Sequence, residues 1–172
     1  MINLFFDCEF THLIRPGDTE PPGLISLGVV SEDGTKRFYA ENAECQLELC
    51  SDFTKTTVLP LLEGGDVSIT YAMLAHQLRT WIESFDGEVK MWSDAPLFDW
   101  PHVQHMFDHH GWPKNLVRKP IALAFPSSIQ TQRFKGAVED IFHSNTRLRR
   151  HHALDDAMVN RMAFKRATAR RY

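Results

Sequence analysis

Two acidic residues interrupt an apolar stretch at the start of the chain. The run from Ile2 to Phe10 is too short for a typical core helix and predicts a buried central strand that carries Asp7 and Glu9. Side chains two positions apart on a strand point to the same face, so the two carboxylates lie side by side. Buried like charges are costly unless a cation lies between them. The pattern therefore favours oxygen ligands for a divalent metal such as Mg²⁺ or Mn²⁺, although an exposed strand end with two hydrated acids would also explain it.

A second polar group precedes the last expected helix. In the stretch HHALDDA, residues 151–157, the helix is expected to begin near Ala153, which puts Asp156 in its first turn. A carboxylate at that position is favoured by the helix dipole and can face a neighbouring strand. His151 lies five residues earlier, on the loop, and a histidine can accept a proton at neutral pH. Alternatively, Asp155 and Asp156 only stabilise the helix N-terminus.

A third acidic position lies in the middle of the chain, between an expected strand over residues 88–93 and an expected helix over residues 99–110. Asp99 falls at the start of that helix, where it could supply a further carboxylate or could cap the helix N-terminus. Asp94 lies where the strand ends and is a competing candidate.

The rest of the sequence predicts the elements that must hold these groups in place. Residues 24–30 and 35–40 indicate two strands, joined by a type I′ hairpin at Asp33-Gly34. Apolar residues at helical spacing between Tyr71 and Phe85 indicate a helix. The other expected elements are a last strand within residues 115–125, short helices within 51–62 and 134–143, and a long final helix over 153–170. This alternation predicts an α/β fold with a mixed sheet flanked by helices.

Composition restricts the class of protein. The chain has 172 residues, 43% of them hydrophobic, and a formal net charge of −3, which fits one domain over residues 1–172 with its own core and argues against disorder. No apolar stretch is long enough to span a membrane, and the N-terminus lacks the basic region of a signal peptide. Three cysteines are too few and too scattered for a disulfide framework or a zinc site, so a cytoplasmic location is expected.

Basic residues gather near the C-terminus of this acidic chain. Residues 144–172 carry eight Lys and Arg against two Asp, which could place a cationic rim beside the carboxylates for an anionic partner. The same arginines could instead form the solvated face of the last helix.

Three histidines form one further cluster. His102, His105 and His109 fall on one face of the helix expected over residues 99–110, at a spacing that could bind zinc. No nearby acid or cysteine in the sequence completes such a site. A hydrated polar face is therefore favoured over a structural zinc site.

Taken together, these acidic and histidine positions resemble the three motifs of the DEDDh family of 3′→5′ exonucleases. The matching residues are Asp7 and Glu9 near the N-terminus, Phe98-Asp99 in mid-chain, and His151 with Asp156 near the C-terminus. The resemblance covers residues 3–162, is weakest between 113 and 144, and is closest to the small ribonuclease-T-like bacterial exoribonucleases. It implies a ribonuclease-H-like α/β fold with a five-stranded mixed sheet flanked by helices.

The resemblance also implies a role for each matching side chain. Asp7 would bridge two Mg²⁺ or Mn²⁺ ions, and Glu9 and Asp156 would complete the site of one of them. Asp99 would support the second ion through water. His151 would be the general base, and a histidine here rather than a tyrosine indicates the h-type branch. His152 is the adjacent alternative, but it lacks the five-residue offset to Asp156.

The activity implied is metal-dependent hydrolysis of phosphodiester bonds, releasing 5′-mononucleotides from the 3′ end of single-stranded RNA or of 3′ overhangs. Phe10 and Thr11 match positions that contact the terminal nucleotide in relatives, although Phe10 could equally pack in the core. The candidates for contacts with backbone phosphates are Arg147, Arg149, Arg150 and Arg161. These motifs do not distinguish RNA from DNA, so a 3′→5′ DNA exonuclease is one alternative. A catalytically silent nucleic-acid-binding domain of the same fold is another. Because relatives are often dimers, the resemblance also implies a homodimer.

Overall fold

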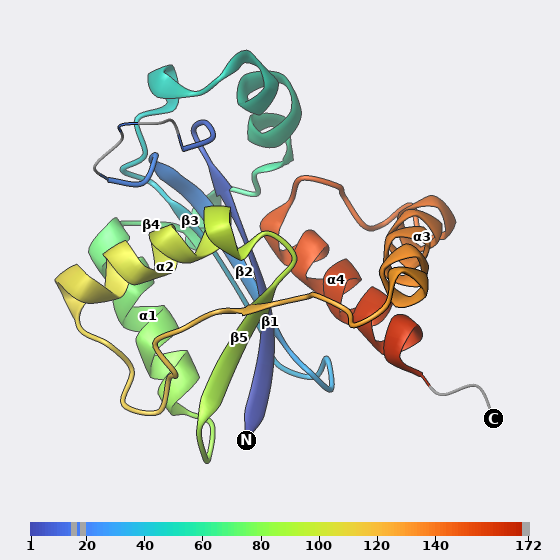
Figure 1. Cartoon of the computed structure of the whole chain (residues 1–172). Helices are drawn as coiled ribbons and strands as arrows, with labels where there is room; N and C mark the ends of the chain where they lie inside the picture. Colours follow the sequence, from blue (N-terminus) through green and yellow to red (C-terminus); the bar gives the residue numbers. More distant parts are fainter. Residues whose placement is uncertain (15–16, 18–19, 170–172) are drawn as a thin grey trace.

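A six-stranded mixed sheet forms the centre of the computed structural model, which describes residues 1–14, 17 and 20–169. β1 lies between β2, to which it is antiparallel, and β5, to which it is parallel (Figure 1). The strand order is β4-β3-β2-β1-β5-β6. The strands are β1 (Ile2–Phe10), β2 (Leu24–Ser31), β3 (Arg37–Asn42), β4 (Ser68–Ile69), β5 (Val89–Ser93) and β6 (Ile121–Ala122).

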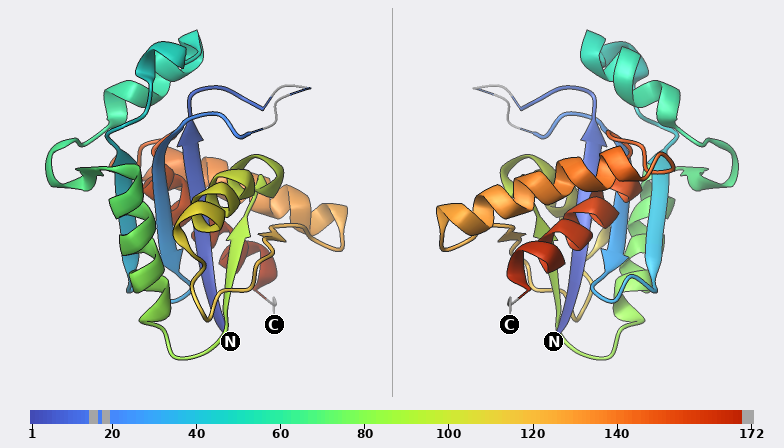
Figure 2. Two further views of the ribbon diagram at one scale, coloured as in Figure 1. Left: turned by 90° about the vertical axis from the view of Figure 1, so that its left-hand side faces the viewer. Right: turned by 90° about the vertical axis from the view of Figure 1, so that its right-hand side faces the viewer.

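Two helices cover each face of this sheet. α1 (Tyr71–Glu83) and α2 (Pro96–His110) lie on one face, whereas α3 (Ser128–Ser144) and α4 (Ala153–Thr168) lie on the other (Figures 1 and 2). A helical segment over residues 52–61 lies beyond the end of β1. No helix within the described ranges is long and apolar enough to cross a membrane.

Successive apolar side chains of β1 contribute to two different core clusters, one on each face of the sheet. Leu4 and Phe6 are buried in the cluster that contains α1 and α2, and Phe5 is buried in the cluster that contains α3 and α4. Because successive strand side chains point to opposite faces, Asp7 and Glu9 share the face of Phe5. The acidic residues of β1 therefore project toward the side on which α4 packs.

The sheet has six strands rather than the five expected from the sequence. The additional strand is β4, a two-residue edge strand parallel to β3. The strand expected within residues 115–125 is reduced to β6 and a single bridge between Val89 and Leu116. Pro120 precedes β6 and Pro126 follows soon after it, and proline cannot donate a hydrogen bond to a strand ladder.

The expected type I′ hairpin between β2 and β3 is wrong. Such a turn needs positive φ at both central residues, but Gly34 has φ 83° and Asp33 is not among the described residues with positive φ. Asp33 instead holds a wider loop together, because its Oδ1 accepts hydrogen bonds from Ser31 Oγ at 2.6 Å and from Thr35 N at 2.9 Å. β3 consequently begins at Arg37, later than expected.

Helix boundaries differ from expectation where local capping decides them. α2 begins at Pro96 rather than near Asp99, since proline is well suited to a first helical position. α3 extends further toward the N-terminus than expected because Ser127 caps it, accepting a hydrogen bond from Gln130 N. α4 ends at Thr168, and its expected last residue, Arg170, lies outside the described residues.

Candidate active site

The predicted acidic residues converge where β1 and β5 end and where α2 and α4 begin. They line a single cavity of about 810 Å³. The carboxylates in its lining are Asp7 and Glu9 from β1, Asp94 and Asp99 at the β5–α2 junction, and Asp156 from α4. Residues as far apart in the sequence as Asp7 and Asp156 are therefore brought to one place by the parallel pairing of β1 with β5 and by the packing of α4 on the sheet.

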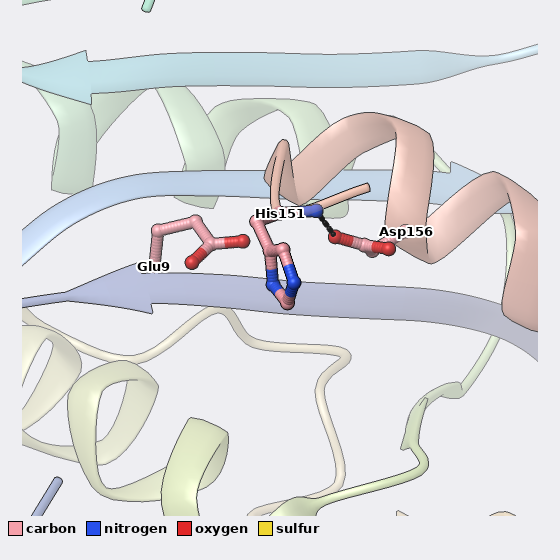
Figure 3. Close-up of side chains that lie close together, drawn as sticks. All are labelled: Glu9, His151 and Asp156. Atoms are coloured by element: carbon pink, nitrogen blue, oxygen red, sulfur yellow. Dashed lines mark hydrogen bonds between the residues drawn. The ribbon is translucent and has the colours of Figure 1, made fainter. Parts of the chain in front are cut away.

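Two groups of side chains in this cavity could hold a metal ion. Within each group the ligand atoms lie within 4.8 Å of one another. One group is Glu9, His151 and Asp156, drawn in Figure 3; the other is Asp7, Asp94 and Asp99. The sequence left Asp94 and Asp99 as competing candidates, and the structure brings both of them to Asp7.

Asp99 does not cap the helix, since α2 already begins at Pro96. Its buried carboxylate accepts a hydrogen bond from the hydroxyl of Ser93, the last residue of β5. Asp94 accepts a hydrogen bond from Asn160 of α4 over 2.8 Å. Ser93 and Asn160 thus orient the two acids, and sequence analysis missed both because serine and asparagine carry no distinctive spacing.

The loop before α4 turns sharply at His151. This residue has φ 66°, a left-handed conformation that is uncommon for a residue other than glycine. Its backbone N–H donates to Oδ2 of Asp156 over 2.7 Å (Figure 3), and the ring of Phe53 packs edge-on against its imidazole at 5.1 Å. The imidazole is thereby held beside Glu9 and Asp156 in the cavity.

The neighbouring residues His152 and Asp155 have structural contacts instead. The buried imidazole of His152 stacks on Tyr39 at 4.4 Å, and its Nδ1 is the N-terminal cap of α4. Asp155 accepts a hydrogen bond of 2.7 Å from Nε of Arg149. Neither residue lines the cavity, so of the two adjacent histidines only His151 lies with the acids.

A glycine in β2 lets α4 approach the sheet closely enough for this arrangement. Gly28 pairs with Asp7 across the β1–β2 ladder. A Cβ atom on Gly28 would lie only 2.2 Å from the backbone nitrogen of Leu154, in the first turn of α4. Sequence analysis missed this residue, although a glycine inside a strand is the signal of close backbone approach.

Substituting Gly28 by alanine is expected to displace α4 from the sheet. The overlap is with backbone rather than with a flexible side chain, so we expect a loss of about 1–3 kcal/mol in the free energy of unfolding and a marked loss of activity. Urea unfolding measures the first effect. Gly136→Ala, in the exposed middle of α3 with nothing within 4 Å of its Cβ position, is the matched control. It should gain about 0.5–1 kcal/mol. Equal stability of the two variants would contradict the close approach at Gly28.

Burial and mutual repulsion raise the pKa values of the clustered acids. Burial raises the pKa of Asp7 well above its usual value, and the charges of Asp99, Asp156 and Glu9 raise it further. Burial, with Asp156 and Asp99 nearby, raises the pKa of Glu9 to about 8. The pKa values of Asp99 and Asp156 are each raised to about 7, mainly by burial. A set of carboxylate oxygens that repel one another in this way fits hard divalent cations, which would remove the repulsion.

Without metal, the protein is expected to lose stability as the pH rises from about 5 to 8. These carboxyls hold protons in the folded state at pH values where the unfolded chain has released them, so the free energy of unfolding falls with pH by up to about 1.4 kcal/mol per pH unit for each such proton. In EDTA the melting temperature should therefore be several degrees lower at pH 8 than at pH 5.5, at roughly 2–4 °C per kcal/mol. Mg²⁺ should restore more stability at pH 8 than at pH 5.5. Thermal melts that are independent of pH in EDTA would contradict the raised pKa values of these buried acids.

Phe10 and Thr11 were both expected to contact substrate, but only Phe10 lines the cavity. Phe10 lines the cavity and stacks on His102, with ring centroids 4.9 Å apart, so it is both packed and accessible from the cavity. Thr11 is fully buried, and its Oγ1 accepts a hydrogen bond from Gly23 N over 3.1 Å. The Thr11 side chain does not line the cavity. Instead, it connects the end of β1 to the segment before β2 through this hydrogen bond.

Of the four arginines considered as phosphate ligands, only Arg150 lines the cavity. Arg149 forms an ion pair of 2.9 Å with Glu63. Arg161 donates to the backbone of the β2–β3 loop. Arg147 is exposed but does not line the cavity.

The histidines of α2 are not part of either candidate metal group in the described part of the chain. His105 and His109 lie with ring centroids 4.3 Å apart, and Nδ1 of His105 is 3.1 Å from the hydroxyl of Tyr71. The expectation of a hydrated polar face is wrong for His102, which is buried beneath Phe10.

Aromatic and aliphatic side chains surround the acidic floor. They come from the end of β1, from the helical segment over residues 52–61 and from the helices α2 and α3. The apolar side chains in the lining include Phe10, Leu13, Phe53, Val58, Phe98, Val138 and Phe142. The cavity thus combines a floor of carboxyl groups with an apolar rim.

No family model matches the chain, and no curated protein matches it in sequence. Several solved structures share its fold. The zinc-ion-bound E. coli ExoI–ssDNA complex matches 96% of the chain with a TM-score of 0.59 and 11% identity. A moderately thermophilic exonuclease I from Methylocaldum szegediense matches 97% of it with a TM-score of 0.61 and 10% identity. The chain covers only 40% of each of these two proteins.

A third similar structure is the nuclease domain of 3'hExo, described as a DEDDh family member bound to rAMP. It matches 94% of the chain with a TM-score of 0.52 and 15% identity, and the chain covers 88% of that domain. At these identities the similarity is one of fold. It confirms the predicted ribonuclease-H-like α/β fold of the DEDDh exonucleases.

Proposed function

We propose that the chain is a divalent-metal-dependent 3′→5′ exonuclease that releases 5′-mononucleotides from single-stranded RNA or 3′ overhangs. The observation that carries this proposal is the convergence of five carboxylates and one histidine in a single cavity of the DEDDh exonuclease fold. A silent binding domain would have no need of so many repelling acids, since each raises the electrostatic cost of the folded state.

The carboxylates are proposed to hold two Mg²⁺ or Mn²⁺ ions. Asp7, Asp94 and Asp99 offer one set of oxygen ligands, and Glu9 with Asp156 offers another. When bound, such ions supply positive charge that stabilises the reacting phosphoryl group and lowers the pKa of water. Ser93 and Asn160 keep the carboxylates of the first set oriented before the ions arrive.

His151 is the proposed general base. Burial lowers the pKa of its imidazole below the usual 6.5, and the nearby charge of Arg150 lowers it further, so the ring is neutral at pH 7. A neutral ring nitrogen can take the proton of the attacking water as the phosphodiester bond is broken. The hydrogen bond from its backbone N–H to Asp156 and the contact with Phe53 keep the ring in place.

The apolar rim supports a single-stranded substrate. Phe10, Phe53 and Phe98 present aromatic surface next to the acids, and unpaired bases stack on such rings without regard to sequence. A base within a duplex is already stacked and cannot use them. The 3′-terminal nucleotide is therefore proposed to insert its base among these rings.

The test is incubation of the protein with a 5′-labelled single-stranded RNA and the matching DNA, each with Mg²⁺, Mn²⁺ or EDTA. We expect a metal-dependent ladder that shortens from the 3′ end, with RNA degraded faster. DNA is the second candidate, because the two exonuclease I structures have higher TM-scores than the rAMP-bound domain, and one of them is a complex with ssDNA. If folded protein cleaves neither strand with either metal, the silent binding domain becomes the better account.

The homodimer that the resemblance implies is part of this proposal. One chain supplies all five carboxylates and the histidine, so the proposed chemistry does not depend on a partner. Light scattering coupled to size-exclusion chromatography, with and without the oligonucleotide, tests this part.

A further inference from the structure

Arg150 is the one Lys or Arg side chain among the described residues that line the cavity. It immediately precedes His151 in the loop before α4. The five carboxylates around it would repel the backbone of a nucleic acid strand, so a fixed positive charge in this cavity has a marked effect on how a strand can lie.

The guanidinium of Arg150 lies at the mouth of the cavity rather than on its floor. Its Nη2 lies 2.8 Å from Oε2 of Glu139, a residue of α3, and its Cζ lies 4.7 Å above the ring of Phe142. The side chain of Arg150 is 43% exposed and that of Glu139 is 68% exposed, whereas Asp99 on the floor is 2% exposed. The stacked ring and the carboxylate hold the guanidinium toward solvent, on the α3 side.

The pair between Arg150 and Glu139 is easily exchanged for another anion. Exposed ion pairs contribute little, since both partners remain well hydrated when separated. A guanidinium binds phosphate oxygens through two parallel hydrogen bonds, and only Nη2 is engaged by Glu139 in the described structure. A phosphate at this position would therefore replace the carboxylate.

We propose that Arg150 binds the phosphodiester group next to the scissile one, and that Glu139 occupies this phosphate position until a strand displaces it. This inference rests on the proposed function, because it assumes that the scissile phosphate lies over the acids on the floor. A strand leaving the floor must then pass the mouth, where Arg150 supplies a cation from the described lining of the cavity. Arg150 would thus select substrates with at least two phosphodiester linkages, and Glu139 would weaken the binding of every strand.

The first test compares Arg150→Ala with Arg147→Ala, an exposed arginine of the same loop that does not line the cavity. KM and kcat are measured on a labelled five-nucleotide strand, RNA or DNA, whichever the wild-type protein hydrolyses faster. Kd for that strand is measured in EDTA over a range of salt concentrations. For Arg150→Ala we expect KM and Kd to rise about 10-fold with a much smaller change in kcat. The slope of log affinity against log salt should fall by about 0.7, the value for one phosphate contact of a single strand.

The second test removes, in turn, the two groups proposed to pair with Arg150, which are the substrate phosphate and the carboxylate of Glu139. A methylphosphonate at the second linkage from the 3′ end should weaken wild-type binding by about the same 10-fold and should not weaken Arg150→Ala further. Glu139→Gln should tighten binding about 2- to 5-fold, because it removes the competing carboxylate at the cost of only an exposed ion pair. That gain should disappear in the Arg150→Ala background.

Equal Kd values and salt slopes for Arg150→Ala and Arg147→Ala would overturn the proposal. So would a loss confined to kcat, which would place Arg150 at the scissile phosphate. Circular dichroism of each variant checks that the fold is retained. If the wild-type protein hydrolyses neither strand, the proposed function fails, and the Kd values for the RNA strand in EDTA still decide whether Arg150 binds a phosphate.

Discussion

Replacing Asp7 by asparagine is expected to abolish hydrolysis and, in the absence of metal, to make the protein more stable at pH 8. Asp7 is the acid whose pKa is raised by the largest number of neighbouring carboxylates, and its strand pairs directly with β5, which leads into the segment that carries Asp94 and Asp99. Asparagine would replace a charged carboxylate by one neutral amide oxygen, and a bound metal is expected to supply several kcal/mol to the transition state, so we expect a loss of about 10³-fold or more in kcat/KM.

The expected gain in stability of Asp7→Asn without metal comes from removing one of the mutually repelling carboxylates. An amide at position 7 can be buried without repelling Glu9, Asp99 and Asp156, so the melting temperature in EDTA at pH 8 should rise by a few degrees, while Mg²⁺ should stabilise the variant less than it stabilises the wild type. Asp86→Asn, at an exposed position outside the cavity, is the matched control and should change neither property. Hydrolysis by Asp7→Asn at the wild-type rate would refute the metal site.

Replacing His151 is expected to have the second largest effect. His151→Asn should lower kcat by about 10²- to 10⁴-fold, the usual contribution of a general base, with metal binding largely retained. Asparagine is the informative choice because it tolerates the left-handed backbone conformation found at this position. We expect the rate of the wild type to decline at pH values below the lowered pKa of His151, and the variant should lose this decline.

His152→Asn is the control for this prediction. Asparagine is a good N-terminal cap, so the start of α4 should be preserved, although the lost stacking on Tyr39 should lower the melting temperature. We expect kcat to change much less than in His151→Asn. If His152→Asn instead causes the greater loss of kcat, the assignment of the base to His151 is wrong.

The sequence was sufficient for the parts of the site that local patterns determine. Burial of β1 on both faces follows from its run of apolar residues, and the position of Asp156 in the first turn of α4 follows from the expected helix start. The mixed α/β architecture followed in the same way, from strands and helices that each show a clear period.

What the sequence did not reveal depends on contacts between distant segments. Asn160 orients Asp94 across 66 positions of the sequence, and Gly28 matters because the backbone at Leu154 lies against it. Neither residue belongs to a periodic pattern or a short motif. Likewise, four arginines near the C-terminus looked equivalent as candidates, and only the folded loop separates Arg150 from those that are bound elsewhere.

The floor of the cavity and the side of the cavity next to α3 are built by different parts of the fold. The floor is built on the central sheet and on the first turns of α2 and α4, whereas Val138, Glu139 and Phe142 come from α3, which packs chiefly against the outer side of α4 (Figure 1). Under the proposed function, substitutions in α3 would therefore alter which polymer is accepted without moving the proposed catalytic groups. If the proposed reaction takes place on this floor, one peripheral helix would be the place where substrate range can evolve while the floor itself is left unchanged.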